Sequence, residues 1–117
     1  MDGIASASII ESQPVQTTVS RRLSDKILAA FNHAFASGET EIADLLRQAL
    51  ESHEGKYGAV QDRRSGFSAL GQADLWIRFV EARDHYKVIS EDTGLKPEVI
   101  ANALDGMKDA YKRWSLS

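Results

Sequence analysis

The side chains of this sequence best suited to metal binding or proton transfer are its three histidines, His33, His53 and His85. None of them has a second histidine three or four residues away, so the helical His-Glu-x-x-His zinc motif is absent. Glu81 and His85 are spaced to share one helix face, but two ligands are too few for a zinc site. The chain has no cysteine, which excludes thiolate catalysis and cysteine-based zinc sites. We therefore predict no metal site and no cofactor.

The candidate nucleophiles also lack a chemical context. Ser65, Ser68 and Ser90 do not lie in the glycine-flanked turn of a nucleophile elbow. The glycine-rich segment GKYGAVQDRRSG, residues 55–66, lacks the spacing of a phosphate-binding Walker loop and follows no predicted strand. No side chain combines a base, an orienting partner and a pocket. We therefore predict no catalytic residue and a protein that is not an enzyme.

Arg63 and Arg64, in the same glycine-rich segment, allow two interpretations. They could belong to a solvated loop. They could also contact an acidic partner, since guanidinium groups bind carboxylate and phosphate through paired hydrogen bonds. Both interpretations stay open.

Length and composition are those of an ordinary globular domain. The 117 residues are 43% hydrophobic and 26% charged, which suits one domain with a modest core. No apolar run approaches the roughly 20 residues of a membrane span, so we predict no membrane association. The net charge of −3 gives no general attraction to nucleic acid or anionic lipid. The lack of cysteine suits a reducing compartment, and we expect a cytoplasmic protein.

The elements that position these residues begin after a polar segment. Residues 1–21 mix Ser, Thr, Gln and Pro without a period, which predicts a disordered tail. Apolar residues then recur at helical spacing on both sides of Gly38, which should end the first helix, and Ser24 is expected to cap that helix. Two helices joined by so short a turn run antiparallel, so residues 22–53 form a hairpin. The inner face of its second helix is expected to hold Ile42, Leu45, Leu46, Ala49 and Leu50.

The second half of the chain repeats this organisation. Residues 54–68, with several glycines, are predicted to form a loop. Residues 69–115 are predicted to form a second hairpin, broken near Gly94 and restarted by Pro97 at the first turn of the last helix. No alternating strand pattern occurs. The predicted fold class is all-α, with four helices in two hairpins, in a single domain of residues 22–117.

The first hairpin carries two family resemblances. LSDKILAAFNHAFASGETEIADLLRQALES resembles a tetratricopeptide half-repeat, with Gly38 at the turn, Ala43 five residues on and the Ala49–Leu50 pair closing the second helix. It departs from that pattern because Ala49 falls one residue early, no proline ends the unit, and nothing recurs at the 34-residue spacing that stacking requires. The segment also resembles the LSDKIL…F..A...G..E.A..L...LE pattern of small uncharacterised alphaproteobacterial proteins. That resemblance covers residues 22–53, implies a bacterial cytoplasmic protein, and carries over no activity or site.

The segment EDTGLKPEVIANALDGM, residues 91–107, has the spacing of a helix-turn-helix around Gly94. This alternative describes a nucleic-acid-binding regulator. Charge argues against it, because residues 88–107 hold four acidic side chains and one basic side chain, whereas DNA affinity comes largely from Lys and Arg. We therefore favour a structural helix corner. The residues that the alternative would use are Lys96, Asn102, Lys108, Lys112 and Arg113.

The second hairpin has more apolar surface than a small core should hide. Leu75, Trp76, Phe79 and Val80 cannot all point inward within one bundle, and the last helix keeps its apolar stripe almost to residue 117. Exposed apolar area above a few hundred Å² usually marks an interface, and a two-fold dimer is the commonest closed solution. We therefore predict a non-enzymatic protein–protein interaction module or regulatory adaptor that forms a homodimer, its other partners unidentified. The expected contact residues are Trp76, Phe79, Tyr86, Tyr111, Trp114, Arg63 and Arg64.

Overall fold

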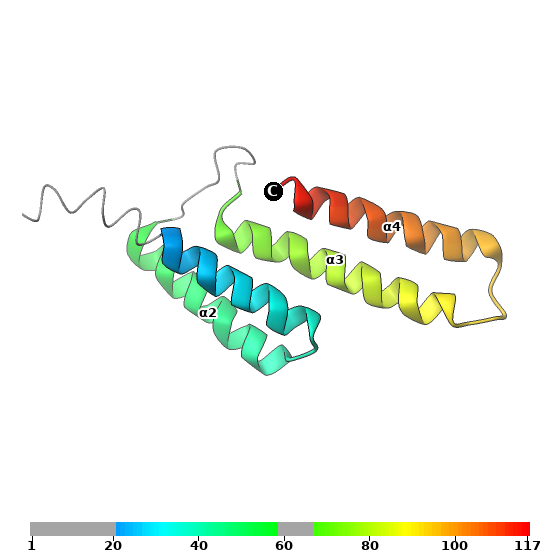
Figure 1. Cartoon of the computed structure of the whole chain (residues 1–117), viewed down its shortest axis with the longest axis horizontal. Coiled ribbons are helices and arrows are strands. Elements are labelled where there is room, and N and C mark those ends of the chain that lie inside the picture. The colour runs from blue at the N-terminus through cyan, green and yellow to red at the C-terminus, as the bar shows by residue number, and fades with distance from the viewer. Residues whose placement is uncertain (1–20, 59–66) are drawn as a thin grey trace, which may run out of the picture.

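The computed structural model describes residues 21–58 and 67–117, and most of these residues are helical (Figure 1). The first helix covers residues 21–36, and three more follow: α2 (Thr40–Tyr57), α3 (Ala69–Ser90) and α4 (Pro97–Ser115). The described residues include no strand. The fold is therefore all-α, with four helices in two hairpins, as predicted. The predicted tail, apart from Arg21, lies outside the described residues, and Arg21 is helical.

The turn of the first hairpin has the chemistry that the sequence predicts. Gly38 has a φ of 82°, a left-handed conformation that glycine adopts without a steric penalty. The prediction for Ser24 is wrong. Ser24 lies inside the first helix and is buried, and its hydroxyl donates to the carbonyl of Arg21 at 3.0 Å. A serine hydroxyl that donates to a carbonyl of its own helix already has its hydrogen bond there, so it is not needed as an N-terminal cap.

The predicted loop 54–68 begins too early. Helix α2 continues to Tyr57 and ends at Gly58, whose φ is 83° and whose N–H donates to the carbonyl of Glu54 at 2.7 Å. Contacts between distant residues extend the helix: the N–H of Leu70 donates to the Glu54 carboxylate at 3.3 Å. Within the helix, the ring of buried His53 lies 5.0 Å from that of Tyr57. These interactions outweigh the weak helix propensity of the glycine at position 55. Residues 59–66 lie outside the described residues.

The core lies between the first hairpin and the first half of α3. Leu50 is 0% and Phe31 1% exposed, and Ala69 and Ala73 present small side chains that let α3 approach them closely. Within α2 the expected inner face is only partly correct. Ile42 and Leu45 are 50% and 63% exposed, and Leu46 is half-buried against the core. The apolar stripe of α2 is wider than the area its neighbours cover.

Helix α3 is central and packs on both sides (Figure 1). Its buried Ala73 and Val80 share the helix face toward the first hairpin, while Phe79 contacts α4 through Tyr111. Helix α4 runs back along α3 after Pro97 begins its first turn, and it does not contact α2. None of the residues of α4 is fully buried. The molecule is thus a row of helices in which α4 is covered along one side by α3.

Candidate interaction surface

Four of the predicted contact residues meet where α3 and α4 pack. Trp76 and Phe79 lie one turn apart on α3, and Tyr111 and Trp114 lie one turn apart on α4, so the antiparallel hairpin brings the two pairs together. The ring centroids of Trp76 and Trp114 are 4.5 Å apart, and those of Phe79 and Tyr111 are 5.3 Å apart in an edge-on arrangement. Such pairs contribute about 0.5–1.5 kcal/mol each beyond their buried area. We call these four residues the aromatic surface.

The aromatic surface is anchored at one end and open at the other. The indole Nε1–H of Trp76 donates to the carbonyl of Asn32 at 2.8 Å, which ties the cluster to the first helix. Tyr111 is 50% exposed, although its ring also contacts Trp114 at 5.6 Å. Phe79 and the two tryptophans are half-buried. These rings therefore both hold the two hairpins together and present apolar surface to solvent.

The other predicted contact residues do not join the aromatic surface. Tyr86 is half-buried on α3, two turns beyond Phe79, and makes no ring contact within the described part of the chain. Arg63 and Arg64 lie outside the described residues. Arg83, also on α3, donates to the carbonyl of Ala36 at 3.1 Å. A cation at that helix C-terminus is favourable because the helix dipole places partial negative charge there.

The five residues of the nucleic-acid alternative do not gather into one surface. Lys96 precedes α4 as its N-cap residue, whereas Lys112 lies in its last turn, about 24 Å away at the rise of an α-helix. Arg113 is paired with Asp109 at 3.0 Å. Helices α3 and α4 lie side by side rather than crossing, so the N-terminus of α4 does not project as it would in a helix-turn-helix (Figure 1). The predicted corner is the short turn of an antiparallel hairpin.

Lys108 and Lys112 nevertheless have a place beside the aromatic surface. They are spaced one turn apart on α4, next to Tyr111, and both are exposed. Neither forms an ion pair with another described residue. Two positively charged side chains therefore lie beside the exposed end of the aromatic surface.

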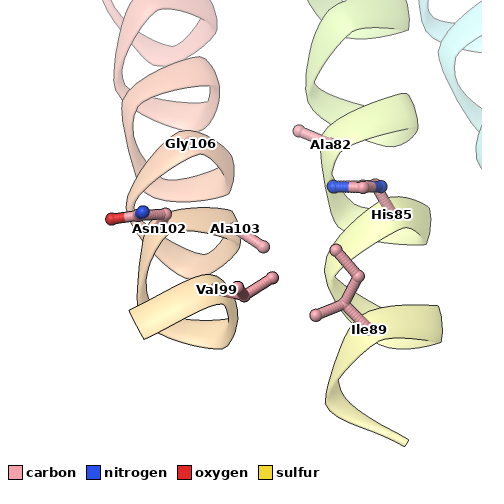
Figure 2. A pocket seen from close by; sticks show the side chains of 7 residues that line it. All are labelled: Ala82, His85, Ile89, Val99, Asn102, Ala103 and Gly106. Carbon is pink, nitrogen blue, oxygen red and sulfur yellow. The ribbon is translucent and has the colours of Figure 1, made fainter. Parts of the chain in front are cut away.

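A groove of about 380 Å³ separates α3 from α4 near the turn that joins them (Figure 2). Its floor is apolar because small side chains face each other across it, and the ring of His85 borders it from α3. A Cβ added at Gly106 would meet no atom within 4 Å. The sequence reasoning missed this groove, although small residues at facing positions were a usable signal. Its lining is Ala82, His85, Ile89, Val99, Asn102, Ala103 and Gly106.

The described residues offer neither a metal site nor a helix that could span a membrane. Across residues 21–58 and 67–117, no three His, Asp or Glu side chains come close enough to hold a metal ion. Over the same ranges, no helix has both the length and the apolar character needed to cross a membrane. Glu81 and His85 form no ion pair there, and His85 borders the groove instead.

Comparison of the chain with protein-family models, with curated proteins and with solved structures finds no match. The resemblance of residues 22–53 to bacterial hairpin proteins therefore stays a prediction.

Proposed function

We propose that this chain is a non-enzymatic protein-interaction module, acting as an adaptor or regulator, whose aromatic surface binds a second copy of the chain. One observation carries the proposal. Helix α4 is strongly amphipathic, yet none of its residues is fully buried, because among residues 21–58 and 67–117 only α3 packs along its apolar stripe. Tyr111 and Val99 are 50% and 40% exposed on α4, and Leu116 just beyond it is 70% exposed.

The composition of this surface fits an interface between proteins. Tyrosine and tryptophan are enriched at interfaces because they bury much apolar area at small cost in side-chain entropy and can also form hydrogen bonds. The smallest assembly that covers the surface with the same chain is a homodimer. The proposal includes a cytoplasmic location, on the ground of a composition without cysteine, and a bacterial origin, on the ground of the resemblance of residues 22–53.

Nucleic acid is not part of the proposal. The net charge is −3, and the basic side chains on α4 are divided between its two ends and an ion pair with Asp109. Phosphate binding needs several free cations on one surface. A salt titration of binding to random duplex DNA tests this exclusion, since an affinity that falls steeply with salt would restore the alternative.

Sedimentation velocity of the full chain across the micromolar range tests the proposal. The wild type should sediment as a dimer or larger species, and Tyr111→Ser should shift it toward monomer. Tyr57→Ser is the matched control, because Tyr57 is 47% exposed on α2, away from the aromatic surface. Circular dichroism of both variants checks that the helices remain. A wild type that stays monomeric at high micromolar concentration would overturn the proposal.

A further inference from the structure

An exposed strip on α2 combines apolar and acidic side chains. Ile42 and Leu45 lie one turn apart and are 50% and 63% exposed. Glu41 and Asp44 flank them at helical spacing, are exposed, and form no ion pair within the described part of the chain. The one cation of this part of α2, Arg47, already lies 2.9 Å from the carboxylate of Asp74 on α3. We call Glu41, Ile42, Asp44 and Leu45 the α2 strip.

A strip on α4 has the opposite charge. Tyr111, which is 50% exposed, and Leu104, which is half-buried, lie two turns apart on its apolar stripe. Lys108 and Lys112 occupy the neighbouring positions and have no carboxylate partner among the described residues. We call Leu104, Lys108, Tyr111 and Lys112 the α4 strip. The α2 strip is thus bordered by two acidic side chains, whereas the α4 strip is bordered by two lysines, with exposed Asp105 one turn before Lys108.

The two strips cannot pair within one molecule. Helices α2 and α4 lie on opposite sides of α3 and do not touch (Figure 1). Two surfaces of complementary charge that are kept apart in one chain can meet only between chains.

We propose that copies of this chain associate head to tail, with the α2 strip of one copy docked on the α4 strip of the next. The inference rests on the proposed function through Tyr111, which the α4 strip shares with the aromatic surface, and it adds a second surface on α2. Opposite charges on the α2 strip and the α4 strip bring two copies together and set their relative orientation, and the apolar side chains of the two strips become buried against each other. A two-fold contact between two α4 strips would instead bring lysine-edged surfaces together, which is unfavourable.

Head-to-tail docking determines which kinds of assembly can form. Each copy uses two different surfaces, so the contact is heterologous and continues until it closes into a ring or ends as an open chain. The species observed should grow with concentration, unless a ring closes. Because both edges are charged and exposed, association should weaken as ionic strength rises.

Charge reversal in the full-length chain tests the inference. One variant carries Glu41→Lys with Asp44→Lys, and the other carries Lys108→Glu with Lys112→Glu. Each alone should lose self-association by at least about tenfold, because its two strips then carry the same sign of charge. An equimolar mixture of the two should associate again, since every strip then finds an opposite one. The control for the first variant is Glu81→Lys with Glu91→Lys, which changes the net charge by the same amount and sign on an exposed part of α3 and its cap.

The possible results distinguish head-to-tail association from a two-fold contact through the aromatic surface. Restored assembly in the mixture, with the control behaving as wild type, supports head-to-tail association. Assembly of the α2-reversed variant at wild-type strength overturns the head-to-tail inference but leaves a two-fold contact through the aromatic surface standing. A monomeric wild type overturns both. Melting curves of each variant show whether a loss of association comes from unfolding instead, and the mixed sample answers the question even if single variants are weakened.

Discussion

Three leucines on α2 provide a graded test of how the first hairpin packs. Leu50 is 0% exposed, Leu46 is half-buried against the core, and Leu45 is 63% exposed. A leucine-to-alanine change removes the same atoms at each site, so the cost should follow burial. We expect about 3 kcal/mol for Leu50→Ala, about 1–2 kcal/mol for Leu46→Ala, and less than about 0.5 kcal/mol for Leu45→Ala.

Urea unfolding followed by circular dichroism measures these differences as shifts in the midpoint at constant slope. For a domain of this size the largest cost corresponds to a fall in the melting temperature of roughly 12–24 °C. Samples should be dilute, so that association does not add to stability. Equal losses for Leu45→Ala and Leu50→Ala would refute the reasoning, because the outer face of α2 would then be covered in solution. The same Leu45→Ala variant should weaken self-association while leaving the monomer stable.

Three further changes have expected outcomes from single sites. Gly106→Ala should raise the free energy of unfolding by about 0.5–1 kcal/mol, and the melting temperature with it, because the site is helical and a Cβ meets no atom within 4 Å. A lower melting temperature would mean that something fills the groove. Gly38→Ala should cost about 1 kcal/mol or more in urea unfolding, since alanine is strained at a φ of 82°, and an unchanged midpoint would contradict that turn. Trp76→Phe should lose about 1 kcal/mol with its bond to the Asn32 carbonyl, and a double cycle with Trp114→Phe should report coupling between the rings; no coupling would mean that they do not touch.

The sequence predicted the helices well where local chemistry decides them. Gly38 and Pro97 set a helix end and a helix start through backbone geometry alone, and both lie where expected. The end of α2 was mispredicted because it depends on the N–H of Leu70, which comes from another helix. Periodicity also could not say which part of a broad stripe is covered. Ile42 was therefore assigned to the inside although it is 50% exposed.

Four of the predicted contact residues come together in the structure, although the reason for choosing them is partly mistaken. The sequence predicts that Leu75, Trp76, Phe79 and Val80 cannot all point inward within one bundle. In the structure α3 has a partner on each side, so Val80 is buried and Phe79 packs on Tyr111. Exposed apolar surface lies on the last helix, α4, whose stripe the sequence analysis also noted, and on α2, where the sequence predicts an inner face. The net charge along the α2 strip depends on which ion pairs form beside it. Arg47 pairs with Asp74, which is far away in the sequence, so this charge could not be predicted from the sequence.

The position of α4 at one side of the row has a consequence for synthesis on the ribosome. Every buried hydrophobic residue that the structure describes lies between Leu28 and Val80, so the core can close once α3 has emerged. Helical hairpins fold in microseconds to milliseconds, whereas synthesis of residues 91–117 takes about 1–5 s at ordinary rates of translation. During that interval the side of α3 that carries Phe79 has no cover. The last helix then closes over a structure that is already folded, so the nascent chain passes through a three-helix stage with an open apolar face.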